Sequence, residues 1–384
     1  MNARNFPVSA DCDCGLYVHV PFCARKCRYC AFYSVIGDLD LQRRYLAAIR
    51  RELELYAFGR PFSSGYIGGG SPTALDISVL QDLVAVTGNL LEKNAELTVE
   101  VNPAQASKDL FVSLKALGVN RISIGAQTFT ESQLEFLGRL HSVGDIYDCV
   151  QYARGAGFEN IGLDLIYAVP GSTLADWKKT LKAAVSLNPS HISAYALTYE
   201  DGSLLRDQLD NGQIVPIDDA TDRAMYETAI ETLAANGFGQ YEISNFSRPG
   251  FQCIHNLRYW QNLPYIGIGP SAASWQRGKR TENIADLRQY FDMINKGQFA
   301  YESDCAISPT QSACETAVLG LRTRTGINLE RFRQQTGFDA TELFGPVIER
   351  HLADGWLQTD ASFLRLSRKA LAVADSILCD FADV

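Results

Sequence analysis

The stretch Tyr17-Val-His-Val-Pro-Phe-Cys23-Ala-Arg-Lys-Cys27-Arg-Tyr-Cys30 decides how the rest of the chain is interpreted. It starts inside a β-rich run, Leu16–Val20, and continues into the expected loop between the first strand and the first helix. Cys23, Cys27 and Cys30 have the spacing of metal ligands. Three thiolates can hold three irons of a four-iron cluster, and the fourth iron then stays open to a small molecule.

A zinc site is the alternative for the same three cysteines. Structural zinc needs four ligands, and His19 could supply the fourth, but it lies within the strand before the loop. We therefore favour the cluster. Metal binding by Cys12 and Cys14 stays open. Four other cysteines are interpreted as thiols that are buried or have no functional role: Cys149, Cys305, Cys314 and Cys379.

Short β-rich runs alternate with amphipathic stretches in the first half of the chain. The strand candidates are Leu16–Val20, Tyr66–Gly68, Leu97–Val101, Arg121–Ile124, Asn160–Leu165 and His191–Ala196. Helical spacing of apolar residues runs from Leu41 to Tyr56, and again from Leu110 to Leu117. Six such units are fewer than the eight of a closed barrel. The pattern predicts an α/β fold with a partial (β/α)6 barrel, open on one side.

The second half follows a different pattern. We expect a helix over Met225–Asn236, and near the end helices followed by a strand-like pair, Gly355–Asp360 and Phe363–Ser367. That order resembles a winged helix, but the tail has no run of Lys or Arg, which favours a structural or lid role over DNA binding. The predicted organisation is a leader (1–14), the barrel (15–225), a covering region (226–300) and a C-terminal α+β, winged-helix-like segment (301–384).

Composition limits the partners and the compartment. The net charge of −9 argues against a nucleic-acid partner. No apolar run approaches the roughly 18–20 residues that a membrane span needs. The first residues, MNARNFPVSADCDCG, contain no apolar core of a secretory signal. We therefore expect a cytoplasmic protein without a membrane span.

A series of motifs extends from about Gly15 to beyond Trp275 in a fixed order. They are YVHVPFC, GGGSPT, EVNP, RISIGAQTF, LGRLHS, LDLIYAVPG, YEISNF and HNLRYW. The series resembles the radical S-adenosylmethionine (SAM) subfamily that contains oxygen-independent coproporphyrinogen III oxidase and the haem chaperone HemW. The resemblance implies a [4Fe–4S] cluster on the three cysteines, with SAM on the open iron. In that chemistry an electron from the cluster cleaves SAM and yields a 5′-deoxyadenosyl radical.

The resemblance also implies which residues bind SAM. They are Tyr17, Gly69, Gly70, Ser71, Glu100, Gln127, Arg139 and Asp164, with Tyr29 and Ala196 as weaker matches. The residue types suit this role, because glycines let the backbone approach a ligand closely. The Glu100 carboxylate could accept hydrogen bonds from a ribose or an ammonium group.

Two features favour the chaperone branch of the subfamily. Phe32 stands where the oxidase has a further cysteine, and the HNLRYW motif is typical of the chaperone. The resemblance implies a haem site at four residues: His255, Asn256, Tyr259 and Trp260. An imidazole or the nearby Cys253 thiolate could ligate haem iron, and the rings could cover a porphyrin. On residue chemistry alone, a core aromatic pair with a hydrogen-bonded histidine explains the same motif.

The prediction is therefore a haem chaperone that delivers haem to haem-dependent respiratory proteins, with a reductant such as flavodoxin or ferredoxin. The alternative is an oxidase that decarboxylates coproporphyrinogen III to protoporphyrinogen IX. A further alternative is another radical SAM reaction, such as methyl transfer or porphyrin ring opening.

Overall fold

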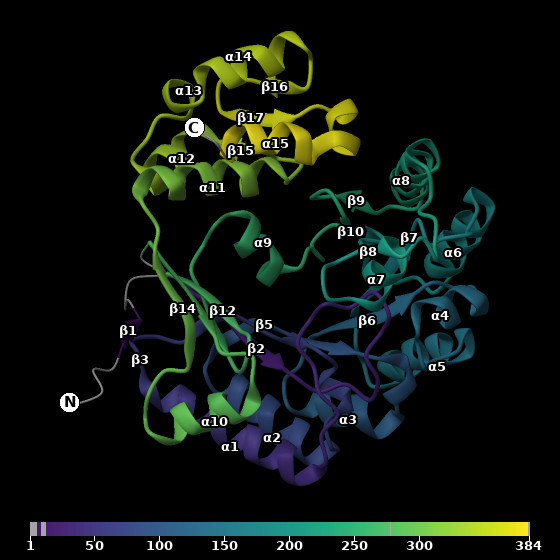
Figure 1. Cartoon of the computed structure of the whole chain (residues 1–384), viewed down its shortest axis with the longest axis vertical. Coiled ribbons are helices and arrows are strands. Elements are labelled where there is room, and N and C mark those ends of the chain that lie inside the picture. The colour runs from purple at the N-terminus through teal and green to yellow at the C-terminus, as the bar shows by residue number, and fades with distance from the viewer. Residues whose placement is uncertain (1–5, 9–12, 277, 383–384) are drawn as a thin grey trace.

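The central layer of the computed structural model, which describes residues 6–8, 13–276 and 278–382, is a mixed sheet (Figure 1). Its strand order is β14-β13-β12-β11-β2-β4-β5-β6-β7-β8-β10-β9. The six strands from β2 to β8 in that order are parallel. Their bounds are β2 Gly15–Val20, β4 Phe62–Gly69, β5 Leu91–Val101, β6 Arg121–Gln127, β7 Asn160–Tyr167 and β8 His191–Ala196. The six predicted strands are confirmed.

Helices between these strands pack on the outside of the sheet (Figure 1). Their bounds are α1 Leu39–Leu55, α2 Ile77–Gly88, α3 Lys108–Ala116, α4 Glu131–Leu137, α5 Val143–Gly155 and α6 Leu174–Ser186. α1 starts after Asp38, whose carboxylate accepts the Leu41 N–H, and it buries Tyr45, Ile49 and Leu53 on one face. In barrels of parallel strands, functional side chains gather at the carboxyl ends of the strands.

Further strands extend both edges of the parallel sheet. β11 is parallel to β2, and β12, β13 and β14 then follow in antiparallel order. At the other edge, β10 and β9 follow β8 antiparallel. These strands are β9 Gly239–Gln240, β10 Asn245–Ser247, β11 Tyr265–Ile268, β12 Ala273–Gln276, β13 Lys279–Asn283 and β14 Tyr301–Ala306. The described residues form no closed barrel, which confirms the partial barrel, although the edge strands were not predicted.

The C-terminal segment forms a separate lobe at the top of Figure 1. Its helices are α11 Pro309–Leu321, α12 Leu329–Thr336, α13 Ala340–Leu343, α14 Gly345–Ala353 and α15 Ala374–Ala382. Its small sheet has the order β15-β17-β16, with bounds Ile327–Asn328, Phe363–Leu366 and Leu357–Thr359. The predicted strand pair is thereby confirmed. One hydrophobic cluster includes both Leu16 of the barrel and Phe381 of this lobe.

The described residues also form three short 3-10 helices, Pro72–Ala74, Pro103–Gln105 and Arg368–Val373, together with four further α-helices and two short strands. These α-helices and strands are α7 Leu204–Asp210, α8 Asp219–Ala235, α9 Ile254–Trp260, α10 Leu287–Asn295, β1 Phe6–Val8 and β3 Tyr56–Phe58. α8 begins before the predicted Met225, because Asp218 caps it by accepting the Thr221 N–H. The predicted domain boundary after residue 225 thus falls inside α8. No helix in the described ranges is long and apolar enough to cross a membrane.

Candidate radical SAM site

The loop with the three cysteines is anchored to the end of α4. The Arg28 N–H donates to the Leu137 carbonyl oxygen (3.0 Å), and the Arg28 guanidinium donates to the Phe136 carbonyl (3.1 Å). Gly138 ends α4 with a φ of +76°, and a Cβ there would lie 3.1 Å from the Arg28 side chain. Only glycine combines this left-handed turn with so close an approach. The turn also brings Arg139 to the loop.

Gly70 packs directly against the cysteine loop. A Cβ at this position would lie 2.6 Å from the Phe22 carbonyl oxygen and 3.0 Å from the Cys23 Sγ. The Gly70 N–H donates to the Val20 carbonyl (2.8 Å), and the Ser71 N–H donates to that of Phe22 (2.7 Å). The glycine run therefore has a structural reason besides ligand approach, because a larger residue would displace the first cysteine.

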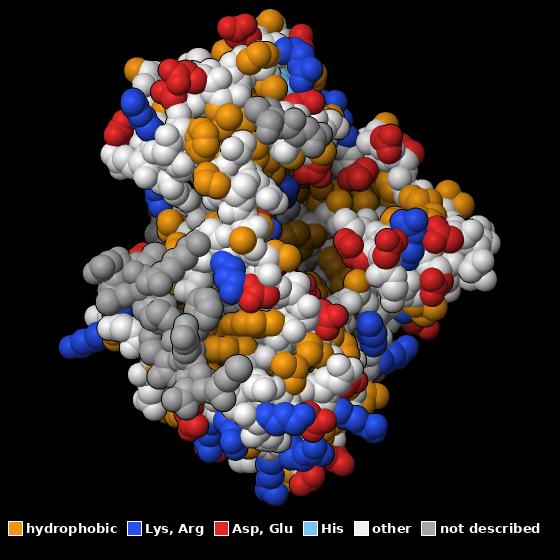
Figure 2. Space-filling model, turned by 60° about the vertical axis from the view of Figure 1, so that its left-hand side comes forward, with side chains coloured by type: hydrophobic (Ala, Val, Ile, Leu, Met, Phe, Trp, Pro, Cys, Tyr) orange, Lys and Arg blue, Asp and Glu red, His pale blue; other side chains and the backbone are white. Residues whose placement is uncertain are grey.

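A cavity of about 840 Å³ opens beside this loop, inside the barrel. Most of the predicted site residues line it: Cys23, Cys27, Cys30, Gly69, Gly70, Ser71, Glu100, Gln127, Arg139 and Asp164. Tyr29, Phe32, Ala196 and Asn256 do so as well. Tyr17 is not among the lining residues; its hydroxyl contacts the His19 Nδ1 (3.0 Å), and its ring lies 6.2 Å from that of Tyr66. Figure 2 shows the surface hollowed beneath the C-terminal lobe, with hydrophobic side chains in its depth.

Two carboxyl groups, Glu100 of β5 and Asp164 of β7, face the cavity from either side of β6. Glu100 accepts hydrogen bonds from the Tyr66 hydroxyl (2.7 Å) and the Gly69 N–H (3.2 Å), and burial raises its pKa to about 7. Asp164 accepts from the hydroxyls of Ser123 (3.1 Å) and Ser193 (2.7 Å), and burial also raises its pKa. Each carboxylate oxygen keeps a lone pair for a ligand N–H or O–H group.

Other polar residues of the cavity were missed from the sequence. Arg121 and Ser123 precede Gly125 and Gln127 along β6, and all four line the cavity. Side chains of a strand alternate between its faces, so residues two apart share the inside of the barrel. This polar alternation along RISIGAQ was a signal that could have identified Arg121 and Ser123. Ser193 of β8 gave no comparable signal.

The residues around the three cysteines fit an iron–sulfur cluster. The Arg139 Nη1–H donates to the Cys27 Sγ (3.3 Å), an interaction that stabilises a thiolate. Burial raises the pKa values of Cys23 and Cys30, so their ionisation depends on a bound metal. Across the described part of the chain, no three His, Cys, Asp or Glu side chains are placed to share one metal ion. A cluster needs no such convergence, since each thiolate binds its own iron.

His19, the candidate fourth zinc ligand, is occupied elsewhere. Its Nδ1 contacts the Tyr17 hydroxyl, and its Nε2 lies 3.4 Å from the Tyr33 carbonyl oxygen. The ring is buried, and burial lowers its pKa to about 4. Because both nitrogens have partners within the protein, the zinc alternative is disfavoured. Cys14 is buried, with its thiol 3.6 Å from the Gly15 carbonyl, and Cys12 lies outside the described residues.

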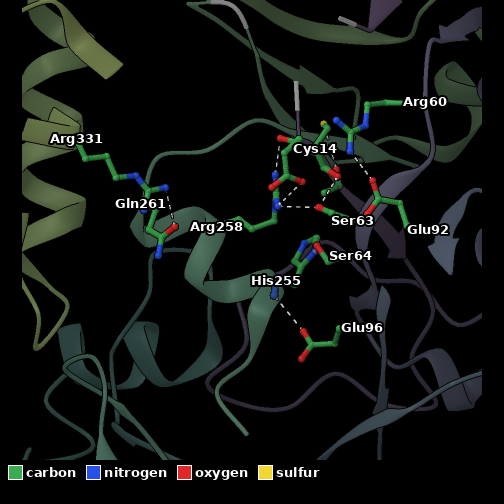
Figure 3. Close-up of polar contacts among 12 residues, drawn as sticks. Cys14, Arg60, Ser63, Ser64, Glu92, Glu96, His255, Arg258, Gln261 and Arg331 are labelled. Atoms are coloured by element: carbon green, nitrogen blue, oxygen red, sulfur yellow. Dashed lines mark hydrogen bonds and ion pairs between the residues drawn. The ribbon is translucent and has the colours of Figure 1, made fainter. Parts of the chain in front are cut away.

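The HNLRYW motif forms α9, which Figure 3 shows fastened to the barrel. Glu96 of β5 accepts the N–H groups of Ile254 (3.2 Å) and His255 (3.0 Å). Arg258 donates to Ser63 (2.8 Å) and to the Asp13 carboxylate (3.0 Å). These contacts hold α9 against the start of β4 and the middle of β5.

His255 lies in the protein interior, with no exposed surface. Its Nδ1 contacts the Ser64 hydroxyl (3.0 Å), and its Nε2 contacts the Tyr259 hydroxyl (2.9 Å). Burial lowers its pKa to about 3, so the imidazole stays neutral. A neutral imidazole can ligate iron, but here the Tyr259 hydroxyl would first have to move.

The other residues of the predicted haem site surround this pair. Asn256 reaches the cavity, whereas the Tyr259 ring packs edge-on against Tyr265 (4.6 Å between centroids). The Arg322 guanidinium lies 5.0 Å from the centre of the Trp260 ring. Cys253 is fully buried, and its thiol lies 3.5 Å from the Glu96 carboxylate. Within the motif His255 and Arg258 are buried, the other four residues are partly exposed, and Asn256 lies at the cavity.

Comparisons with known proteins agree with this geometry. Residues 17–184 match the family model of the Radical SAM superfamily, and residues 307–373 match that of the HemN C-terminal domain. The fold is similar to the structure of coproporphyrinogen III oxidase (HemN) from Escherichia coli, with a TM-score of 0.85 and 22% sequence identity. The superposition covers 98% of this chain and 91% of the HemN chain. The fold and the three-cysteine site define a radical SAM protein, a class that implies a [4Fe–4S] cluster and SAM.

Relatives that match over nearly their full length show which family of radical SAM proteins the chain belongs to. "Heme chaperone HemW" of Bacillus subtilis is 32% identical over 371 residues, which are 95% of this chain and 98% of that protein. The Escherichia coli protein of the same name is 32% identical, over 94% of this chain and 96% of that protein. "Radical S-adenosyl methionine domain-containing protein 1, mitochondrial" of Danio rerio is 32% identical, over 95% of this chain and 86% of that protein. The chain belongs to the HemW family.

Proposed function

We propose that this protein is a cytoplasmic haem carrier. It binds haem and delivers it to haem-dependent respiratory proteins. The supporting observation is its identity of about 32%, over nearly the full length, to relatives named heme chaperone HemW. Phe32, where the oxidase branch is expected to have a cysteine, favours the same function. A flavodoxin or ferredoxin is the proposed reductant.

The proposed cofactor site is the cavity inside the barrel. Cys23, Cys27 and Cys30 hold the cluster there, which supplies an electron and an open iron when it is bound. The residues proposed for SAM are Tyr17, Gly69, Gly70, Ser71, Glu100, Gln127, Arg139 and Asp164. The carboxyl groups of Glu100 and Asp164 accept ligand N–H or O–H groups, and the walls of the barrel limit the access of water.

The proposed haem site lies along α9, at His255, Asn256, Tyr259 and Trp260, and Asn256 links it to the cavity. His255 becomes an iron ligand when the Tyr259 hydroxyl leaves its Nε2, while Ser64 continues to orient the ring through Nδ1. Cys253 is the less favoured ligand, because burial raises the pKa of its thiol to about 12 and keeps it protonated.

A hemin titration of the anaerobically reconstituted protein tests this proposal. We expect a Soret shift in the wild type and its loss in His255→Ala. Tyr259→Phe frees Nε2, so it should bind hemin at least as tightly as the wild type. His351→Ala serves as the control, because this buried histidine contacts Asp380 in the C-terminal lobe. A wild type without a Soret shift, or an unchanged shift in His255→Ala, would contradict the function or the site, respectively.

The oxidase alternative is tested in the same preparation. With coproporphyrinogen III, SAM and a reductant, we expect no protoporphyrinogen IX. Its formation would show that the protein is an enzyme of porphyrin synthesis rather than a carrier.

A further inference from the structure

A triangle of polar side chains, Ser71, Thr73 and Gln105, joins the loops that follow β4 and β5. The Gln105 Oε1 lies 3.1 Å from the Ser71 Oγ and 3.0 Å from the Thr73 Oγ1, and the two hydroxyl oxygens lie 3.2 Å apart. Ser71 lines the cavity, whereas Thr73 and Gln105 are not among its lining residues. Ser71 is therefore the member of the triangle that can contact a ligand.

The position of Gln105 is fixed by the residues just before it. The Asn102 side chain accepts the Ala104 N–H (3.2 Å) and so caps the short 3-10 helix Pro103–Gln105. The Asn102 N–H donates to the Thr73 Oγ1 (3.1 Å), which fastens the loop after β5 to the loop after β4. Gln105 thus reaches the other two side chains from outside the cavity.

The number of hydrogens in the triangle decides what Ser71 presents to the cavity. The Gln105 Oε1 can only accept, so the two hydroxyl hydrogens point to it or from one hydroxyl to the other. In every arrangement that satisfies the Gln105 oxygen from both sides or in series, the Ser71 hydrogen stays within the triangle. The Ser71 oxygen then has a lone pair, and no hydrogen, for a ligand.

The lone pairs of Ser71 are not used by the backbone either. Ser71 precedes the 3-10 helix Pro72–Ala74, a position from which a serine side chain often accepts an N–H of the first helical turn. Here the Ser71 side chain makes no capping bond to the described residues, and Pro72 has no N–H to offer. Ser71 is only 7% exposed, so its free lone pair is best satisfied by a donor group of a ligand.

The surroundings of Ser71 indicate which donor group of the ligand it would meet. The Ser71 N–H donates to the Phe22 carbonyl (2.7 Å), and the preceding Gly70 packs against the Cys23 Sγ. Ser71 is thereby held beside the first cluster cysteine. With SAM on the open iron, its amino acid part lies nearest to the cysteines. The carboxylate of that part can only accept, so the amino group is the donor.

We propose that Gln105 is a positioning residue, which holds the Ser71 hydrogen away from the cavity so that the Ser71 oxygen accepts an N–H of the SAM amino group. The inference rests on the proposed SAM site. Without the Gln105 oxygen, the Ser71 hydrogen is free to point into the cavity, where it would face another donor. Gln105 acts through Ser71 and does not itself touch the ligand.

Equilibrium dialysis of the anaerobically reconstituted protein measures the affinity for two probes. They are SAM and deamino-SAM, in which a hydrogen replaces the amino group. Gln105→Met removes the acceptor with little change in side-chain length, and Gln105→Glu keeps an acceptor oxygen. Gln151→Met is the matched control, because Gln151 is exposed on α5 and does not line the cavity. Ser71→Ala, alone and combined with Gln105→Met, shows whether the effect passes through Ser71.

Gln105→Met should bind SAM about three- to tenfold more weakly than the wild type, since one oriented hydrogen bond is lost. Its affinity for deamino-SAM should equal that of the wild type, and Gln151→Met should match the wild type with both probes. Gln105→Glu should bind SAM within about twofold of the wild type. In the Ser71→Ala background, Gln105→Met should cause no further loss.

Equal losses for SAM and deamino-SAM in Gln105→Met would overturn the inference, because they would show a general disturbance of the loop. Wild-type affinity of Gln105→Met for SAM would overturn it too, and so would a further loss in the double variant. These results would leave the proposed SAM site in place, provided that the wild type binds SAM. A wild type that binds no SAM would contradict the proposed site itself, and the inference with it.

Discussion

Glu52 on α1 is a fully buried carboxylate outside the cavity, and its ionisation should set how stability changes with pH. It accepts hydrogen bonds from the Tyr290 hydroxyl (2.6 Å), the Gly269 N–H (2.8 Å) and the Asn283 side chain (2.7 Å). It thereby joins α1 to α10 and to the strands beyond β2. Burial raises the pKa of Glu52 from 4.5 to about 7, although these three donors oppose the rise.

The sign and size of the effect follow from proton linkage. Between pH 4.5 and 7 the folded state binds the proton of Glu52 more tightly than the unfolded state, so stability falls as the pH rises. The stabilisation by the protonated carboxyl is complete below the unfolded pKa and is lost as the pH passes the folded one. From pH ~5.5 to pH ~8, Glu52 alone should lower the free energy of unfolding by about 2 kcal/mol.

Anaerobic urea denaturation of the wild type and Glu52→Gln at these two pH values measures the effect. Because the amide does not titrate, the wild type should lose about 2 kcal/mol more than Glu52→Gln on going to the higher pH. Glu54→Gln, an exposed neighbour on α1, should behave like the wild type. Equal pH dependence of the wild type and Glu52→Gln would refute the reasoning.

Three further predictions concern the site. Cys27→Ser should lose iron on reconstitution, whereas Cys253→Ser keeps it; equal iron contents would contradict the cluster assignment. Arg139→Gln removes the N–H that contacts the Cys27 Sγ, so the cluster potential should become more negative in a redox titration, and an unchanged potential would exclude that contact. Glu96→Gln weakens two bonds to the start of α9 and should lower the free energy of unfolding by about 1–2 kcal/mol. Glu92→Gln, in an exposed pair with Arg60, should lower it by less than about 1 kcal/mol; an equal effect would contradict the role of Glu96.

The parallel strands could be predicted because buried strands form apolar, β-branched runs. Leu16–Val20 and Leu97–Val101 are examples, and the structure places strands over both. β5 begins at Leu91 rather than at the predicted Leu97. The added residues include Glu92 and Glu96, whose charges give no strand signal. Their pairing comes from β4, where Ser64 lies opposite Glu96, and such long-range pairing cannot be read from local pattern.

The site was predictable where its chemistry is local in sequence. The spacing of the three cysteines is such a signal, and all three line the cavity. The convergence of Ser123 and Ser193 on Asp164 depends on the register of three strands, so no local motif marks it. The environment of His255 was equally hidden, because its partner Ser64 lies 191 positions away. The residue chemistry of the motif alone favoured a core histidine, and only the family resemblance raised the iron ligand to an equal interpretation.

The central claim is that a protein with a radical SAM site serves as a haem carrier. Its most direct test is one anaerobic preparation, reconstituted with the cluster and SAM, in which hemin binding and coproporphyrinogen III consumption are measured in parallel. We expect a Soret shift that depends on His255, with coproporphyrinogen III left unchanged. Formation of protoporphyrinogen IX without a Soret shift would contradict it.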